Sequence, residues 1–157
     1  MRRRDLLALS AIALLAGPAG SQTIRRVWRI GFLSGRARPA TFEGDAHGAF
    51  LEGMRDLGRR EGVDFVMEWR FAGGDFRRLP ELAAELVRAK VDIIVTSPAI
   101  ASRAARDATA TIPVVFAYVS NPVASGLVQS LAKPGGNVTG LAVQQSDISP
   151  KQVELLV

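Results

Sequence analysis

Small polar residues follow several stretches of the chain that have the pattern of β-strands. Three of these groups are Ser34-Gly35, Ser97-Pro98-Ala99 and Ser120-Asn121. Their hydroxyl, amide and backbone groups can hydrogen-bond a small polar ligand, and the free N–H groups of a helix capped by Ser97 can hold a carboxylate or another anion. The same residue types dominate turns. The residues alone therefore support a ligand-binding rim and a set of ordinary turns and caps equally well.

Residues suited to catalysis, cofactor binding or metal binding are sparse. The sequence has no cysteine, and His47 is its only histidine, which excludes disulfides, thiolate ligands and a cysteine nucleophile. It contains no G-x-G-x-x-G after the first predicted strand, no phosphate loop ending in GK[ST] and no G-x-S-x-G turn. No group of His, Asp and Glu has metal-ligand spacing. We therefore expect no catalytic residue, cofactor or metal site, and we interpret His47 as a surface residue and Trp28 and Trp69 as core residues.

The composition is that of a globular chain about one domain long. Of the 157 residues, 48% are hydrophobic and 22% are charged, which is enough apolar surface for a core and too little charge for a disordered chain. The formal net charge is +5, and the remaining basic excess beyond the first few residues is dispersed and not interleaved with aromatic residues. We therefore expect no nucleic-acid partner.

The first 21 residues have the pattern of an export signal. Basic residues at Arg2 to Arg4 precede a mainly apolar stretch, 6–16, and small residues at Ala19 and Ser21 suit a cleavage site before Gln22. The apolar stretch is too short to span a bilayer, which takes about 20 residues. The last two arginines resemble a twin-arginine signal, a plain secretory signal is an equal alternative, and an ordinary N-terminal helix is a third. Export predicts a periplasmic or secreted protein, and the lack of cysteine excludes a lipoprotein anchor.

The rest of the chain alternates between strand and helix patterns. Such alternation is typical of a doubly wound α/β fold with a parallel sheet, in which ligands bind beyond the carboxyl ends of the strands. Asp45 is the expected cap of the first helix and Gly62 its stop, and Ser97 is the expected cap of the third. The predicted strands are 27–33, 64–70, 91–97, 112–119 and 137–143, and the predicted helices begin near residues 46, 79, 97, 123 and 149.

Four segments carry a resemblance to a known family. The sequence is similar to the substrate-binding proteins of a bacterial ABC transporter family that includes tryptophan- and tyrosine-binding members. The segment from Ile112 to Leu141 is the most specific part, because of its order of strand, small polar residues and proline, helix, Pro-Gly-Gly-Asn and second strand. The four segments are RIGFLSG, LPELAAELVRAKVDIIVT, TIPVVFAYVSNPVASGLVQSLAKPGGNVTGL and SPKQVELL.

The resemblance implies a type I periplasmic-binding fold, a clamshell of two α/β lobes that closes on a ligand. Residues 22–142 would form the N-terminal ligand-binding lobe. Residues 143–157 would form the hinge region and the start of a helix that leads to a second lobe. Full members of the family are considerably longer, and the sequence stops inside its last predicted helix, so we expect a truncated chain that holds the first lobe only.

The resemblance also implies a role in transport without catalysis. The protein would bind a small organic ligand, such as an amino acid, and deliver it to a membrane permease and its ATPase. Asn121 stands where the family commonly has Asp, which removes a negative charge that could pair with a ligand ammonium group. The ligand-binding residues implied by the matching segments are Ser34, Gly35, Ser97, Pro98, Ala99, Ser120 and Asn121.

Two other functions remain open at the level of sequence. The chain could be the ligand-binding lobe of a sensory protein, which an attached signalling segment would reveal. It could also be a fragment of an exported α/β enzyme whose catalytic residues lie elsewhere, although none of the residues present supports catalysis.

Overall fold

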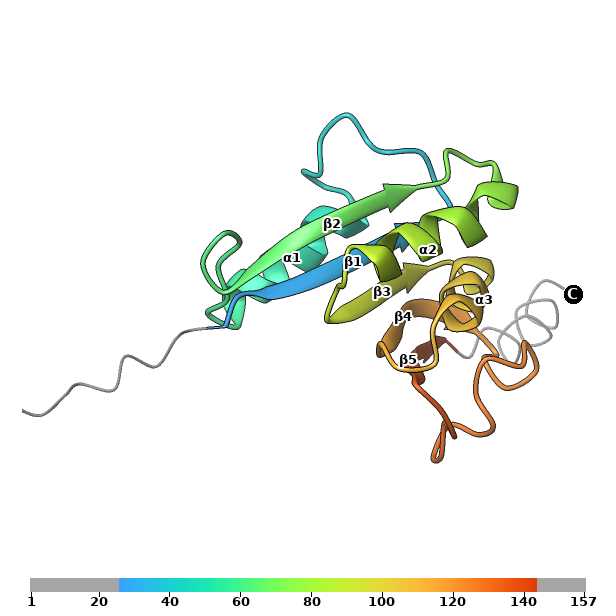
Figure 1. Cartoon of the computed structure of the whole chain (residues 1–157). Coiled ribbons are helices and arrows are strands. Elements are labelled where there is room, and N and C mark those ends of the chain that lie inside the picture. Colours follow the sequence, from blue (N-terminus) through green and yellow to red (C-terminus); the bar gives the residue numbers. More distant parts are fainter. Residues whose placement is uncertain (1–25, 144–157) are drawn as a thin grey trace, which may run out of the picture.

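The computed structural model describes residues 26–143, so the predicted export signal and the helix predicted from residue 149 lie outside the described residues. Within this range, five parallel strands form one sheet in the order β2-β1-β3-β4-β5 (Figure 1). The predicted α/β parallel sheet is therefore confirmed. The elements are β1 (Trp28–Ser34), α1 (Ala46–Asp56), β2 (Phe65–Phe71), the 3₁₀ turn η1 (Phe76–Arg78), α2 (Leu79–Arg88), β3 (Ile93–Ser97), α3 (Ala99–Ala108), β4 (Val114–Ser120) and β5 (Val138–Val143).

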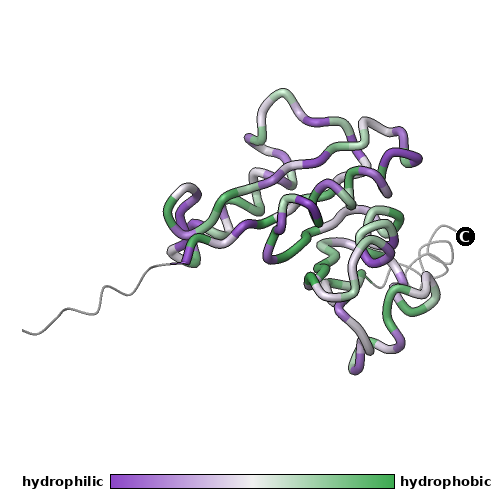
Figure 2. The backbone as a smooth tube through the Cα atoms, in the orientation of Figure 1, coloured by the Kyte–Doolittle hydropathy of each residue, from purple (hydrophilic) through white to green (hydrophobic). Residues whose placement is uncertain are grey.

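Helices cover both faces of the sheet. Helices α2 and α3 pack on one face, where Leu86 and Ala101 are among the fully buried residues of the larger core. Helix α1 packs on the other face, and its Phe50 and Met54 contact a smaller core built from β1, β2 and β3 (Figure 1). The hydropathy colouring in Figure 2 agrees with helices that cover both faces of the sheet, because β3 is largely apolar while the turns of the helices that face away from the sheet are polar. Strands that are apolar on both sides belong inside such a covered parallel sheet.

The first helix begins as the sequence predicts but ends earlier. The Asp45 side chain accepts a hydrogen bond from the His47 backbone N–H and so caps the start of α1. The helix ends at Asp56, not near Gly62 as predicted. Gly58, at φ 71°, takes the left-handed conformation, and its N–H and that of Arg59 bond back to carbonyls of the last turn. This is the pattern of a glycine-terminated helix, so the first glycine after the apolar positions stops the helix.

The predicted helix at residues 123–131 is absent, and turns take its place. The Asn121 side chain accepts from the Ala124 N–H, and the Asn121 carbonyl accepts from the Ser125 N–H, which closes one helical turn. The Gln129 N–H then bonds to the Pro134 carbonyl and reverses the chain. Nucleating a helix costs free energy that further turns must offset, and this segment turns back before they can form.

The third helix begins one residue later than predicted. Ser97 is the last residue of β3 and Pro98 occupies the cap position of α3, with no hydrogen bond from a capping side chain. The predicted cap at Ser97 is therefore wrong. A buried hydroxyl pair fixes the helix start instead, because Thr96 Oγ1 and Ser102 Oγ lie 2.8 Å apart. This pair holds the first turn of α3 against the end of β3.

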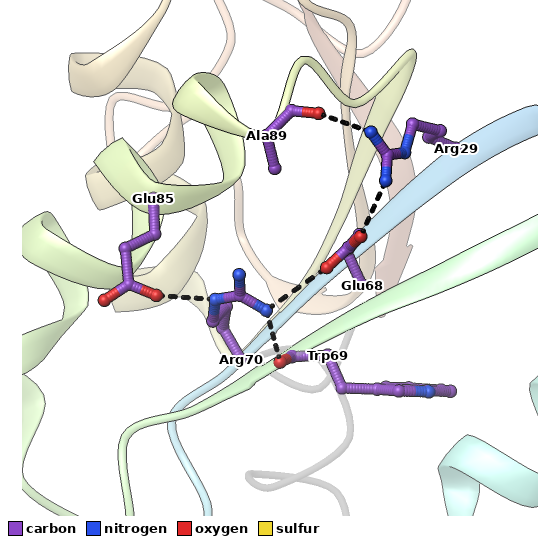
Figure 3. Close-up of polar contacts among 6 residues, drawn as sticks. All are labelled: Arg29, Glu68, Trp69, Arg70, Glu85 and Ala89. Carbon is purple, nitrogen blue, oxygen red and sulfur yellow. Dashed lines mark hydrogen bonds and ion pairs between the residues drawn. The ribbon is translucent and has the colours of Figure 1, made fainter.

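An ion-pair network links α2 to the edge strand β2. The Arg70 Nε donates to Glu85 of α2 at 2.6 Å, and Glu68 lies between Arg70 and Arg29 (Figure 3). Arg29 also donates to the carbonyl of Ala89, the C-cap residue that follows α2. Partly exposed pairs of this kind each contribute little to stability, but together they orient α2 over β1 and β2.

The Pro-Gly-Gly-Asn corner has a structural role at the amino end of the sheet. The Asn137 side-chain amide donates to the backbone carbonyls of Thr109 and Ile112, at 2.9 and 2.8 Å. These carbonyls belong to the connection between α3 and β4, so Asn137 ties the start of β5 to that connection. The corner lies at the opposite end of the strands from Ser120 and Asn121.

Replacing Asn137 with alanine should lower the free energy of unfolding by about 2 kcal/mol, because two partly buried carbonyls lose their donor. Urea unfolding followed by circular dichroism measures this change. Gln129→Ala removes an exposed amide from the neighbouring turn and is the matched control, expected to change the free energy by less than about 0.5 kcal/mol. Equal losses in the two variants would contradict the assigned role of Asn137.

Candidate functional site

The carboxyl ends of the central strands meet at one edge of the sheet. Ser34 of β1 and Ser97 of β3 are register partners, and the Gly35 N–H donates to the Ser97 carbonyl at 3.0 Å, one residue beyond the strand. The predicted groups Ser34-Gly35 and Ser97-Pro98-Ala99 are thus brought side by side. This is the edge at which open parallel sheets bind ligands.

A cavity of about 240 Å³ opens at this edge, beside the start of α1. Its polar lining comes from Ser34, Arg36, His47 and Ser97, and its apolar lining includes Phe32, Phe50 and Tyr118. Complete pockets for small molecules have about 300–1,000 Å³. The cavity is therefore large enough for part of a small ligand and offers it both apolar walls and hydrogen-bonding groups.

The two predicted serines in the cavity differ in exposure and in whether their hydroxyl groups already have a hydrogen bond. Ser34 is buried, and its Oγ accepts a hydrogen bond from the Arg36 backbone N–H at 3.2 Å. This bond shapes the chain as it leaves β1. Ser97 is partly exposed, and no hydrogen bond described for residues 26–143 uses its hydroxyl. Ser97 is therefore the better placed of the two to contact a ligand.

The other predicted site residues surround the cavity without lining it. Gly35 is buried, and a Cβ there would lie 2.7 Å from the Phe76 ring and 3.1 Å from Pro98 Cδ, so the glycine permits close packing. Pro98 is the cap residue of α3 and Ala99 its first residue, directly after the cavity residue Ser97. Ser120, the last residue of β4, and Asn121, which follows it, are exposed. Their ligand contacts stay a prediction.

His47 is buried, with only 3% of its surface exposed, so its interpretation as a surface residue is wrong. Four aromatic rings lie within 6 Å of its ring centroid. The distances from the His47 centroid to the other ring centroids are 4.8 Å for Phe32, 5.2 Å for Phe71, 5.6 Å for Trp69 and 5.7 Å for Phe42. We call His47 and these four rings the aromatic cluster.

The two tryptophans have different surroundings. Trp69 packs within the aromatic cluster, as expected of a core residue. Trp28 is 49% exposed, and the Arg26 guanidinium lies 4.2 Å from its ring, so its interpretation as a core residue is wrong. Trp28 is the first residue of β1, at the amino end of the strand.

Asp45 connects the helix cap to the cavity. Its carboxylate accepts from the His47 backbone N–H at 2.8 Å and also contacts His47 Nδ1. The backbone hydrogen bond is the largest cause that lowers the pKa of the Asp45 carboxyl below its ordinary 3.8, and the His47 side chain and Arg36 lower it further. Asp45 is therefore ionised at neutral pH.

Because the pKa of Asp45 is lower in the folded state, its carboxylate stabilises the fold above about pH 3.8, and this contribution is lost as the pH falls through the folded pKa. Asp45→Asn should therefore be less stable than wild type at neutral pH, and the difference should shrink in acid. Urea unfolding at a series of pH values tests this. Glu43→Gln, which changes an exposed carboxylate in the preceding loop, is the control. If the difference in stability between Asp45→Asn and wild type does not change with pH, ionisation of Asp45 is not the cause of the stabilisation.

A larger hollow of about 610 Å³ lies at the opposite edge of the sheet. Trp28, Phe65, Ile93 and Pro113, from the amino ends of four strands, contribute to its lining. None of the predicted site residues lines it. We favour the smaller cavity because it lies at the carboxyl ends of the strands.

The described residues contain no other site with evident chemistry. Residues 26–143 hold no group of three or more His, Asp or Glu side chains that could bind a metal ion. Over the same range, no helix has the length and apolar character needed to cross a membrane. The arrangement at the cavity can bind a ligand through hydrogen bonds and apolar contacts.

Sequence reasoning missed Arg36, His47, Phe50 and Tyr118 as cavity residues. For His47, one signal was available in the sequence. It lies two residues after the helix cap Asp45, close to the loop that connects β1 to α1. The aromatic residues Trp69 and Phe71 also alternate along β2, which places their side chains on one face of the sheet.

Comparison with known proteins establishes the class of protein to which this α/β chain belongs. Residues 30–157 match the family described as ABC transporter substrate binding protein. The chain belongs to this family. The family consists of substrate-binding proteins, not of enzymes.

Individual relatives agree with this assignment. The chain is 35% identical over 91 residues to the tyrosine-binding protein of Clostridioides difficile strain R20291. It also resembles the ABC domain in complex with L-Trp from Streptococcus pneumonia, with a TM-score of 0.63 and 26% identity. A ligand-free, open substrate-binding protein with adhesive properties from Clostridium difficile matches with a TM-score of 0.71 and 28% identity. A conserved domain protein from Vibrio cholerae matches with a TM-score of 0.72 and 26% identity.

The chain spans less than half the length of these relatives. The match covers 58% of this chain but only 26% of the tyrosine-binding protein. It covers 74% of this chain and 39% of the L-Trp complex, and 82% of this chain and 43% of each of the other two structures.

Proposed function

We propose that the chain forms one lobe of an extracytoplasmic solute-binding protein that delivers a small organic ligand to an ABC transporter. The observation that carries this proposal is the cavity at the carboxyl ends of β1 and β3, lined by Ser34 and Ser97. Membership of the substrate-binding family supports it. The ligand class that we favour is an amino acid, because one relative is named for tyrosine and another was solved with L-Trp.

The rim of the cavity suits the charged end of an amino acid. Ser97 supplies a hydroxyl group, and helix α3 starts two residues later with N–H groups that have no partner within the helix. A carboxylate at this helix start would be stabilised by those donors and by the helix dipole. Arg36, which lines the cavity, adds a positive charge.

Transport requires parts beyond the described residues. In our proposal, residues 22–142 form the first lobe and residues 143–157 form the hinge region toward a second lobe. Closure of the two lobes on the ligand would create the form that a membrane permease and its ATPase read. The basic and apolar pattern of residues 1–21 supports export to the periplasm, by a twin-arginine or a general secretory route.

Calorimetric titration of the chain with L-Trp, L-Tyr and other amino acids tests the proposal. We expect saturable but weak binding, because one lobe of a clamshell buries less of the ligand than two. Ser97→Ala should weaken binding by about tenfold, as expected for the loss of one hydrogen bond.

Ser130→Ala is the matched control, because Ser130 bonds only to Lys133 in a loop at the other end of the sheet. It should leave the affinity unchanged. If the chain binds no amino acid, the proposed ligand class is wrong. If Ser97→Ala and Ser130→Ala bind alike, the site lies elsewhere on the chain.

A further inference from the structure

His47 lines the cavity, and its Nδ1 contacts the carboxylate of its helix cap, Asp45. The Asp45 carboxylate, which contacts Nδ1, can only accept a hydrogen bond when ionised. Nδ1 therefore carries the hydrogen, and in the neutral imidazole Nε2 is left as an acceptor. Asp45 thus sets the tautomer of His47, just as second partners set the tautomer of functional histidines in general.

The Nε2 atom remains accessible although the ring is almost fully buried. No hydrogen bond described for residues 26–143 uses Nε2 of His47. In the same range, no fully buried side-chain nitrogen or oxygen lacks a hydrogen-bond partner. Nε2 is therefore not fully buried, and His47 is one of the residues that line the cavity.

The remaining walls of the cavity suit a flat aromatic group. Phe32 of β1 and Phe50 of α1 line it with their ring centroids 6.0 Å apart, and the exposed Tyr118 of β4 also lines it. The volume, about 240 Å³, is below that of complete ligand pockets. The cavity thus has the size and lining for one part of a ligand, while the start of α3 can hold the charged end.

We propose that the cavity is the subsite for an aromatic ring that carries an N–H or O–H donor, and that His47 Nε2 accepts that hydrogen bond. The inference rests on the proposed function and goes beyond it by naming the chemical group that the site selects. A ring without a donor would fill the same space but leave Nε2 desolvated and unpaired. Sites built to pair with a ligand hydroxyl or N–H reject analogues that lack it for this reason.

The first experiment probes the subsite without a complete ligand. His47 is the only histidine, so one imidazole appears in nitrogen-15 NMR spectra of the labelled chain. At mildly alkaline pH we expect the tautomer protonated at Nδ1. Addition of p-cresol or indole should shift the Nε2 resonance, whereas toluene, of similar shape but without a donor, should not. The other tautomer, or equal responses to p-cresol and toluene, would overturn the proposal.

The second experiment measures selectivity by calorimetry with the chain and its variants. Wild type should bind L-Tyr at least about tenfold more tightly than L-Phe, and L-Trp more tightly than 1-methyl-L-tryptophan. His47→Phe keeps a ring of similar packing and should abolish both preferences. Trp28→Phe, at the exposed opposite edge of the sheet, is the matched control and should retain them.

The two experiments separate the two proposals. A His47 response to p-cresol without binding of any amino acid would support the aromatic subsite and contradict the proposed ligand class. Tight amino-acid binding with equal affinities for L-Tyr and L-Phe would support solute binding and overturn the role of His47.

Discussion

The parallel register between β1 and β3 is the constraint on which the site depends. Ser34 and Ser97 are partners in this register, and the backbone bond from Gly35 to Ser97 extends the pairing beyond the strands. Parallel strands need crossover connections, so the loop before α1 and the start of α3 emerge at the same edge. A shift by one residue would turn Ser34 to the other face of the sheet and close the cavity.

Asp45 connects local helix chemistry to the character of the cavity. The same carboxylate caps α1 through the His47 N–H and holds the His47 ring through Nδ1. The rings of the aromatic cluster surround the imidazole and leave it little freedom to rotate. A helix start, a histidine orientation and the polarity of a cavity are therefore coupled through one side chain.

The contacts that hold the connections lie away from the cavity. Asn137 holds the connection between α3 and β4 at the amino end of the sheet. The network of Arg29, Glu68, Arg70 and Glu85 lies along the edge strand β2 and holds α2 over it (Figure 3). Neither set lines the cavity. The carboxyl end is consequently free to carry polar groups such as Ser97 and Arg36, which contribute little to the core and are available to a ligand.

The sequence by itself determined the alternating strands and helices, the parallel sheet and the edge where Ser34 and Ser97 meet, because hydrophobic periodicity and helix caps are local signals. The helix predicted at 123–131 failed because its chain reversal is set by Asn121 and by the bond between Gln129 and Pro134. Only the tertiary structure decided that His47 is buried, because its neighbours come from β1, β2 and the intervening loop. Burial by residues distant in sequence leaves no periodic pattern around the histidine itself.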